Sequence, residues 1–378
     1  MSMLPAPDYV RRIAPYQGGK PVSELAREFG LDEAQIIKLA SNENPYGMPQ
    51  SARTAMAAAA TQLARYPDGN GFELKAAISR RFNVPQEWLT LGNGSNDILE
   101  LAAKAFVRPG DSSVFSDHAF AVYGLASQAV GARSIVVPAL RDGPDVYGHD
   151  LEAMLAAITA DTRIVFIANP NNPTGTFIPG AQVERFLERA PKDVVVVYDE
   201  AYTEYLAPQE RPDAFAWVQR FPNLLVSRSF SKAYGLAGLR VGYGVAQGEI
   251  TDLLNRIRQP FNVNLLAQAA AAAALFDDAW LEQMFAANRA GIAQLETGFA
   301  ALNLRWLPSR GNFILVQVAN PTSGQGDPAM AVYDHLLRSG VIVRPVGNYG
   351  LSGWLRISVG LPAENAAFLV ALAKALGR

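Results

Sequence analysis

A lysine set among small hydroxyl residues and glycines marks the segment from Ser229 to Arg240. Lys232 has no acidic residue beside it there, and an apolar run typical of a buried strand comes just before. Burial disfavours the charged form of lysine, and a neutral lysine amine attacks aldehydes. Ser229, Ser231 and Arg240 carry groups that bind phosphate. The segment predicts a site for pyridoxal 5'-phosphate, an aldehyde bearing a phosphate; the alternative is a Gly/Ser loop with a stray lysine.

Two further polar clusters follow short apolar runs at 164–168 and 194–198. The first reads Asn-Pro-Asn-Asn-Pro-Thr-Gly and includes Asn172, and the second, Asp-Glu-Ala-Tyr, begins at Asp199. Both runs are short and β-branched, as buried parallel strands are. Because open α/β sheets bind ligands at the carboxyl ends of their strands, we expect these residues and Lys232 at one sheet edge. Taken singly, the first cluster also fits a plain turn, and the aspartate also fits a helix cap.

The chemistry of the cofactor suggests a role for each of these side chains. Its ring withdraws electrons only while the ring nitrogen is protonated, and a carboxylate such as Asp199 keeps that proton in place. The 3'-oxygen needs hydrogen-bond donors, which Asn172 and Tyr202 provide. If a helix starts at Asp199, Tyr202 lies one turn along it.

A glycine-rich loop at 92–97 offers a place for the phosphate. It separates a strand expected at 88–91 from helical spacing over 98–106. Such a loop points backbone N–H groups at an anion, although it matches neither a dinucleotide-binding nor a Walker loop. Glycine turns before helices are common, so the loop supports a phosphate site only together with the serines and Arg240.

Composition excludes several classes of protein. The net charge of −2 argues against nucleic-acid binding, which needs a basic face. The absence of cysteine excludes disulfides and thiolate catalysis. His118, His149 and His335 lie far apart in sequence and suggest no metal site. The apolar run 265–276 is shorter than the ~20 residues that span a bilayer, and the N-terminus does not resemble a signal peptide. We therefore expect a cytoplasmic protein.

The order of elements predicts an α/β fold with two domains. Strands alternate with helices over 46–270, which predicts a large cofactor-binding domain whose mostly parallel sheet lies between helices. Residues 1–45 and 271–378 are expected to form a smaller α+β domain. Helical spacing over 265–302 is expected to bridge the two, and 322–327 is expected to be a surface loop.

Taken together, the motifs resemble those of the fold-type I, aspartate-aminotransferase-like enzymes that use pyridoxal phosphate, and within them the histidinol-phosphate branch. The likeness covers nearly the whole length. Its motifs are PYQGG at 15–19, SNENPYG at 41–47, RYPDG at 65–69, GNGSND at 92–97, PNNPTG at 170–175, YDEAY at 198–202, SFSKAYGLAGLRVGY at 229–243 and LRISVG at 355–360.

The resemblance implies which residues bind the cofactor. Lys232 carries it covalently, Asp199 pairs with the ring nitrogen, and Asn172 and Tyr202 bind the 3'-oxygen. The phosphate is held by the backbone of Ser95 and Asn96 and by Ser229, Ser231 and Arg240.

The resemblance also implies a stacking ring and a second subunit. Phe120 falls where the family stacks an aromatic ring on the cofactor, although Tyr123 is a rival for that role. Tyr66 is similar to a tyrosine that reaches the phosphate in the neighbouring subunit. A homodimer with shared active sites is therefore expected.

For the substrate, the resemblance implies L-histidinol phosphate, with 2-oxoglutarate as the amino acceptor. Arg356 resembles the arginine that holds the substrate's anionic group, and Arg344 matches a second basic position of the histidinol-phosphate branch. Two guanidinium groups suit a phosphate dianion, and Tyr16 can donate a further bond. Arg344 also fits a surface arginine, and glutamate's second carboxylate could use it instead. An aromatic amino-acid aminotransferase is the main alternative, and a decarboxylase of a phosphorylated amino acid is another. We do not expect a cofactor-sensing regulator, which would carry an added DNA-binding module.

Overall fold

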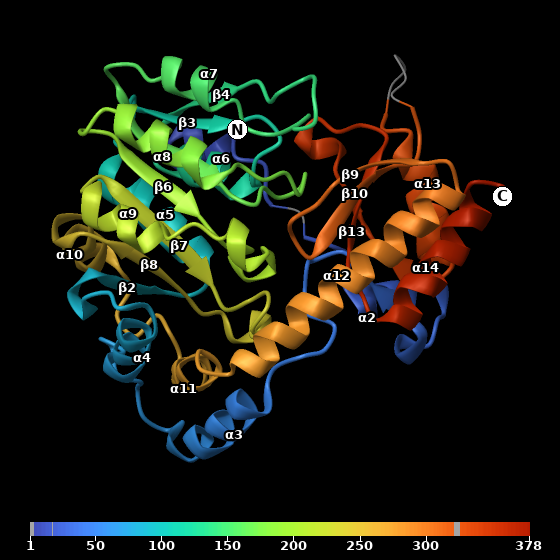
Figure 1. Ribbon diagram of the computed structural model, residues 1–378, viewed down its shortest axis with the longest axis horizontal. Coiled ribbons are helices and arrows are strands. Elements are labelled where there is room, and N and C mark those ends of the chain that lie inside the picture. Colours follow the sequence, from blue (N-terminus) through green and yellow to red (C-terminus); the bar gives the residue numbers. More distant parts are fainter. Residues whose placement is uncertain (1–3, 17, 321–325) are drawn as a thin grey trace.

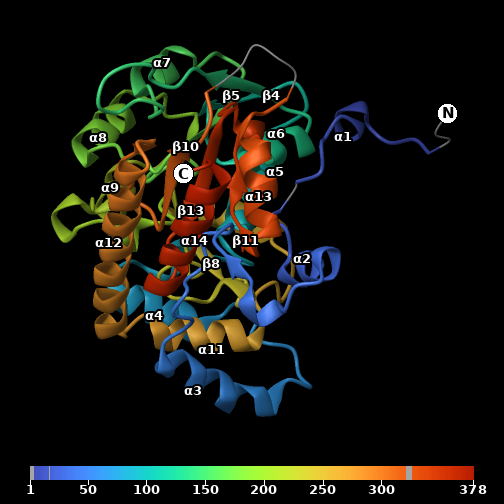
Figure 2. The ribbon, with the colours of Figure 1, turned by 90° about the vertical axis from the view of Figure 1, so that its right-hand side faces the viewer.

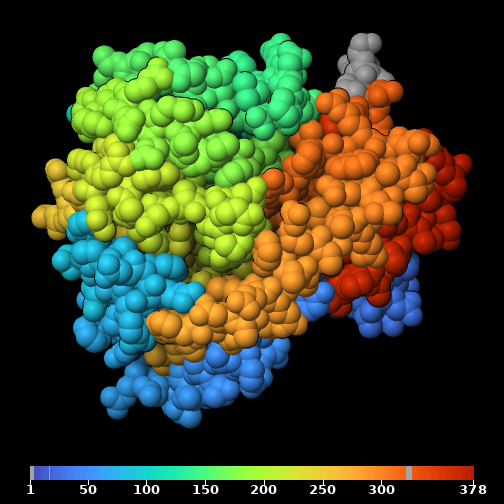
Figure 3. All heavy atoms as spheres, viewed as in Figure 1, coloured from blue at the N-terminus to red at the C-terminus, as the bar shows by residue number. Residues whose placement is uncertain are grey.

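The computed structural model describes residues 4–16, 18–320 and 326–378. Strands lie on either side of the long helix α12 (Asp278–Ala301), which runs across the molecule (Figure 1). The middle of the sequence forms the larger side, around a seven-stranded sheet. The C-terminal strands and the N-terminal segment form the smaller side. Figure 3 shows the atoms of α12 filling the face where the two sides meet.

The seven-stranded sheet is mostly parallel. Its spatial order is β2 (Leu89–Gly92), β8 (Gly242–Ala246), β7 (Leu224–Ser229), β6 (Val195–Asp199), β5 (Thr162–Ala168), β3 (Ser112–Ser116) and β4 (Arg133–Val137). The five strands from β7 to β4 pair in parallel, whereas β8 is antiparallel to both of its neighbours. The sheet predicted from the sequence is thus confirmed, and the antiparallel β8 is an addition to it.

Side chains alternate across this sheet, so both of its faces are buried. In β5, Ile164 and Phe166 belong to one core, whereas Val165 and Ile167 belong to the other. The first core lies under α5 (Ser95–Phe106), α6 (Ala121–Ala129) and α10 (Gly248–Ile257). The second lies under α4 (Phe72–Phe82), α8 (Gly180–Arg189), α9 (Ala214–Arg220) and α11 (Leu265–Ala274). Burial on both faces explains why the parallel strands read as continuous apolar runs.

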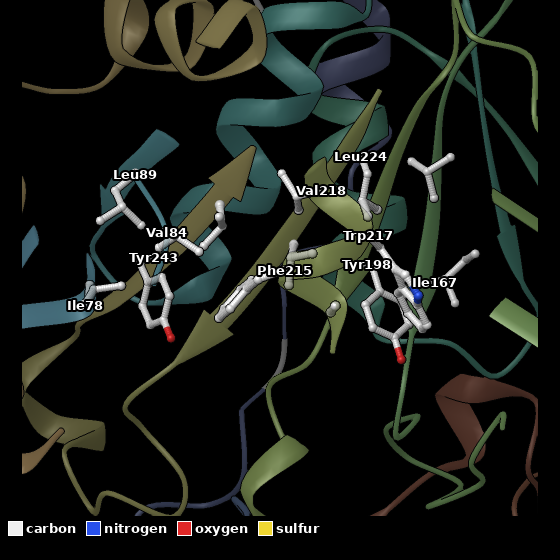
Figure 4. Packing of buried hydrophobic residues seen from close by; sticks show 14 of the residues in the cluster. Ile78, Val84, Leu89, Ile167, Tyr198, Phe215, Trp217, Val218, Leu224 and Tyr243 are labelled. Carbon is white, nitrogen blue, oxygen red and sulfur yellow. The ribbon is translucent and has the colours of Figure 1, made fainter. Parts of the chain in front are cut away.

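Large aromatic rings fill the second core. Tyr198 of β6 packs edge-on against Trp217 of α9, with 5.7 Å between ring centroids (Figure 4). The hydroxyl of Tyr198 accepts a hydrogen bond from Asn169 Nδ2 at 2.8 Å, so its polar end is satisfied within the core. This contact ties the end of β6 to the loop that follows β5.

The smaller side has an antiparallel sheet. Its order is β12 (Arg344–Pro345), β13 (Trp354–Ser358), β10 (Phe313–Gln317) and β9 (Arg305–Leu307). Helices α12, α13 (Ala329–Arg338) and α14 (Pro362–Ala375) enclose a separate core with it, around Phe299 and Phe368. The N-terminal segment joins this side, because β1 (Ile37–Lys38) pairs in parallel with β11 (Val341–Ile342) (Figure 2).

The remaining helices are short. They are α1 (Asp8–Arg11), α2 (Val22–Phe29), α3 (Gln50–Ala59) and α7 (Leu151–Ala156). Within the described ranges, no helix is long and apolar enough to cross a membrane. The same ranges hold no group of three or more His, Cys, Asp or Glu side chains placed to bind a metal ion.

The structure departs from the sequence-based expectations at several element boundaries. Helical spacing over 265–302 is divided between α11 and α12, because the Asp277 carboxylate accepts a bond from Trp280 N and starts a new helix. Trp88 ends a 3₁₀ turn rather than beginning a strand. No helix starts at Asp199; Tyr202 lies in a turn before a 3₁₀ turn at Thr203–Tyr205. The loop expected at 322–327 lies mostly outside the described residues.

Candidate active site

A cavity of about 390 Å³ lies at the carboxyl ends of β5, β6 and β7, and residues from both sides of the molecule line it. The predicted site residues that line it are Tyr16, Ser95, Asn96, Phe120, Asn172, Asp199, Tyr202, Ser229, Ser231, Lys232, Arg240, Arg344 and Arg356. The structure thus brings together residues spread over 341 positions of sequence, from 16 to 356. Tyr66 is the predicted site residue that does not line this cavity.

Lys232 lies just after β7, with its amine inside the cavity. Its Nζ donates to Ser41 O at 3.4 Å and lies 5.6 Å from the ring centre of Tyr202. Burial of the amine, followed by the positive charge of Arg356, lowers the pKa of Lys232 to about 8. The lysine therefore has an appreciable neutral fraction near pH 8, as the sequence-based argument requires for a nucleophile.

Asp199 ends β6 and is only 5% exposed. Its Oδ2 accepts a bond from the Tyr123 hydroxyl at 2.9 Å, and its Oδ1 accepts one from Ala201 N at 3.2 Å. Burial raises the pKa of Asp199 to about 6, while the bond from Tyr123 acts in the opposite direction. The carboxylate is thus mainly ionised at neutral pH and is held by neutral donors on both oxygens.

Asn172 and Tyr202 belong to a polar network at the centre of the cavity. The bond between Asn172 and Pro173 is cis. Asn172 Oδ1 accepts a bond from Arg356 Nη1 at 2.5 Å, and the Tyr202 hydroxyl accepts one from Asn42 Nδ2 at 2.9 Å. This network joins the two proposed 3'-oxygen ligands to the proposed substrate arginine and to the N-terminal segment.

One end of the cavity has the donors that a phosphate needs. Ser95 begins α5, so its N–H is among those without an intrahelical partner. Arg240 Nη1 lies 3.5 Å from Ser231 Oγ. Gly94 has φ +87°, which favours glycine, and a Cβ there would lie 2.6 Å from Arg240 Nη2 and would displace the guanidinium. A helix start, serine hydroxyls and a guanidinium fit the phosphate of the predicted cofactor.

The two candidates for the stacking ring lie in different surroundings. Tyr123 is fully buried, and its ring stacks on Phe166 with 4.8 Å between centroids and 7° between planes. Phe120 is only partly buried and meets Tyr123 edge-on at 5.9 Å, and both residues line the cavity. The Tyr123 ring is therefore already covered by Phe166 on one face, which favours Phe120 for stacking on a ligand.

Arg344 and Arg356 face each other across two strands. They are register partners in the antiparallel pair of β12 with β13, and both are buried. Arg344 Cζ lies 5.8 Å from the ring centre of Tyr16. Burial lowers the pKa of Arg356, and the positive charge of Arg344 lowers it further. An anion bound between these two cations would relieve their repulsion.

The family of the chain follows from comparison with known proteins. The family model for aminotransferases of class I and II matches residues 34–372. The chain belongs to this aminotransferase family. Its membership agrees with the fold and with the cluster around Lys232.

Two relatives of this aminotransferase share a name. Histidinol-phosphate aminotransferase 1 of Cupriavidus pinatubonensis is 65% identical over 370 residues, which are 98% of this chain and 96% of the relative. Histidinol-phosphate aminotransferase 2 of Ralstonia nicotianae is 63% identical over 378 residues, which are 100% of this chain and 99% of the relative. The resemblance to the histidinol-phosphate branch is confirmed.

Solved structures confirm the fold-type I architecture and the cofactor. Histidinol-phosphate aminotransferase from Sinorhizobium meliloti, in complex with pyridoxal 5'-phosphate, superimposes with a TM-score of 0.87 at 28% identity, over 98% of this chain and 96% of that one. A double mutant of Thermus thermophilus aspartate aminotransferase shares the fold, with a TM-score of 0.84 at 23% identity, over 99% and 100% of the two chains. The aminotransferase depends on pyridoxal phosphate, as its sequence predicted.

Three residues of the aminotransferase site have contacts that the sequence did not reveal. Tyr123 binds Asp199, Asn42 binds Tyr202, and Ser41 accepts from Lys232. Ser41 and Asn42 belong to the SNENPYG motif, which contributed to the family resemblance but did not indicate a function for either residue. Their bonds span 160 to 191 positions, which no local pattern can show.

Proposed function

We propose that this aminotransferase transfers the amino group of L-histidinol phosphate to 2-oxoglutarate, giving imidazole acetol phosphate and glutamate in histidine biosynthesis. The names of its relatives at 65% and 63% identity support the substrate. The observation that carries the proposal is the facing pair Arg344 and Arg356 in the cavity wall. Two adjacent guanidinium groups offer a phosphate dianion more charge and more donors than a carboxylate needs.

Within this function, four side chains serve the cofactor's reactive ring. When bound, pyridoxal phosphate supplies an electron-withdrawing ring that stabilises negative charge at the substrate carbon. Lys232 would hold the cofactor through its Nζ, and the same amine would carry a proton to and from that carbon. The Asp199 carboxylate keeps the ring nitrogen protonated. Asn172 and Tyr202 hold the 3'-oxygen, and their existing bonds to Arg356 and Asn42 restrict their orientation.

The other site residues anchor the cofactor and the substrate. We assign the phosphate of the cofactor to Ser95, Asn96, Ser229, Ser231 and Arg240, and the stacking contact to Phe120. The substrate phosphate is assigned to the two cavity arginines, with Tyr16 beside them. Tyr16 is 55% exposed at the mouth of the cavity, where it can close over a bound ligand.

Tyr66 supports a homodimer with shared sites. It is 82% exposed and stacks on Phe261, itself 44% exposed, with 4.8 Å between centroids. Two adjacent exposed aromatic rings suit a protein contact better than solvent. We propose that Tyr66 reaches the cofactor phosphate of a second copy of the chain, and that this assembly acts in the cytoplasm.

The division into domains is also a proposal. We assign residues 46–270 to the large domain, and residues 1–45 with 271–378 to the small one. Separate hydrophobic cores around Val196 and around Phe368 support this division. The pairing of β1 with β11 supports placing the N-terminal segment in the small domain.

Product analysis tests the reaction. The purified enzyme, supplied with pyridoxal phosphate, L-histidinol phosphate and 2-oxoglutarate, is expected to form glutamate and the phosphorylated ketone in equal amounts, as measured by mass spectrometry. Phenylalanine is expected to be a much poorer amino donor. Preference for phenylalanine would instead support an aromatic amino-acid aminotransferase. Release of carbon dioxide from a phosphorylated amino acid without 2-oxoglutarate would support a decarboxylase.

A further inference from the structure

Tyr123 has a buried hydroxyl that is directed at Asp199, the carboxylate that is proposed to pair with the ring nitrogen of the cofactor. It lies in the first turn of α6 and is 0% exposed, and its hydroxyl donates to Asp199 Oδ2 at 2.9 Å. Its position is fixed from several directions. The ring stacks on Phe166, and its own carbonyl accepts a bond from Ser127 Oγ at 2.7 Å. A donor held in this way offers Asp199 a single, pre-set hydrogen bond.

We propose that Tyr123 is a positioning residue for the reaction, whose neutral hydroxyl keeps Asp199 ionised and aimed into the cavity. This inference rests on the proposed role of Asp199 toward the ring nitrogen. A cation in the same place would also keep the carboxylate ionised, but it would compete with the protonated ring nitrogen for the negative charge. A phenol donates without cancelling that charge, because its proton stays on its own oxygen.

The surroundings explain why the carboxylate needs this donor. Burial is the largest influence on Asp199 and raises its pKa, and the nearby charge of Glu200 acts in the same direction. The bonds from Tyr123 and Ala201 N, and the charge of Lys232, act the other way. Burial and the charge of Asp199 raise the pKa of Tyr123 well above 10, so the phenol remains protonated and donates at every working pH.

The test compares three single variants by cofactor affinity rather than by turnover. Apoprotein is titrated with pyridoxal phosphate between pH 6 and pH 9, and the dissociation constant is read from protein fluorescence. Tyr123→Phe removes one oxygen from the proposed donor. Tyr198→Phe is the matched control, because Tyr198 precedes Asp199 on β6 and is also 0% exposed, but its hydroxyl accepts a bond from the neutral Asn169. Asp199→Asn removes the charge itself.

For Tyr123→Phe we expect affinity at pH 7 to fall roughly ten-fold or more, the loss typical of a hydrogen bond to a charged group. The loss should shrink toward pH 9, because a carboxylate with a raised pKa still ionises there. Tyr198→Phe should stay within about two-fold of wild type at each pH. In the Asp199→Asn background, Tyr123→Phe should add little, since the charge it serves is gone.

The outcomes separate this inference from the function on which it rests. If Asp199→Asn weakens binding but Tyr123→Phe follows the wild-type pH profile, or shifts it no more than Tyr198→Phe, the role of Tyr123 is wrong. If Asp199→Asn binds the cofactor as wild type does, both roles fail. Should Tyr123→Phe not fold, the wild-type profile decides. If wild-type affinity for pyridoxal phosphate is maintained as the pH falls to near 6, the inference is supported. If wild-type affinity already declines above pH 7.5 as the pH falls, and Asp199→Asn shows no such decline, the inference is overturned.

Discussion

Asp199 and Glu200 are neighbours at the end of β6, yet the protein treats their charges in opposite ways. Glu200 Oε2 accepts bonds from Arg228 Nε and Nη2, both at 2.8 Å. Arg228 in turn lies against the ring of Phe215, with its Cζ 4.1 Å from the centroid. Asp199 faces the cavity and is held by the Tyr123 hydroxyl and a backbone N–H. One carboxylate is paired with an arginine in the core, whereas the other lines the cavity and is held by neutral donors.

The difference shows how a fold can bury two carboxylates for different purposes. A carboxylate paired with an arginine stabilises packing around it, but its charge is no longer available to a ligand. Burial raises the pKa of both carboxyl groups; Arg228 opposes this rise at Glu200, whereas at Asp199 the pKa reaches about 6. The proposed pairing of Asp199 with a positively charged ring nitrogen accounts for the cost of burying its charge.

The largest effect is expected from Lys232→Ala. Loss of the amine removes both the covalent attachment and the proton carrier, so turnover should fall by at least roughly a thousand-fold. The visible absorbance of the bound cofactor should disappear as well. Lys75→Met is the control, because Lys75 is another buried lysine but does not line the cavity. Near wild-type turnover in Lys232→Ala would contradict the assigned role.

Glu200→Gln should be the most destabilising change in the comparison. Breaking a buried ion pair leaves the Arg228 charge without its carboxylate and should lower the free energy of unfolding by about 3 kcal/mol. Chemical denaturation of the apoprotein measures this loss. Turnover per folded molecule should change little, because Glu200 does not line the cavity. Unchanged stability would show that the pair contributes nothing.

Asp199→Asn should have the opposite signature. In the folded chain the pKa of Asp199 is raised from 3.8 to about 6, so its ionisation costs stability as the pH rises through that range. The free energy of unfolding of Asp199→Asn should therefore exceed that of the wild type by about 3 kcal/mol at pH 7, and this gain should vanish below pH 4. Turnover should nevertheless fall by roughly a hundred-fold, because the ring nitrogen loses its charge partner. An unchanged kcat would refute the role of Asp199.

Arg344→Ala should have the smallest but most selective effect. We expect kcat/KM for histidinol phosphate to fall by roughly ten- to a hundred-fold, and that for phenylalanine by only a few-fold. Arg338→Ala, on α13 and outside the cavity, serves as the control. Equal losses for both amino donors would argue against phosphate binding at Arg344.

Local patterns were enough to predict the elements that carry the site. Short apolar runs located β5, β6 and β7, and the polar residues after them predicted where Asn172, Asp199 and Lys232 would meet. This prediction was possible because the periodicity of a strand and the polar residues at its end are both encoded by residues close together in the sequence. The same reasoning found the glycine loop, in which Gly94 lies close to the Arg240 guanidinium.

Contacts between distant segments could not be predicted in this way. The bond from Tyr123 to Asp199 joins residues 76 positions apart, and the pairing of Arg344 with Arg356 depends on strand register. The sequence offered Tyr123 only as a rival stacking ring. The break before α12 was missed because one capping aspartate interrupts an otherwise continuous helical spacing. Such details follow from tertiary packing rather than from residue patterns.

A single-turnover titration tests the central claim most directly, that the cavity's charges are kept for a phosphorylated amino substrate. L-histidinol phosphate, L-glutamate and L-phenylalanine are added one at a time to the loaded enzyme, and the absorbance of the bound cofactor is followed without any keto acid. We predict complete conversion at low concentrations of histidinol phosphate and glutamate, and little with phenylalanine. Preferential conversion by phenylalanine would contradict the claim, although the fold, the cofactor and the contrast between Asp199 and Glu200 would remain.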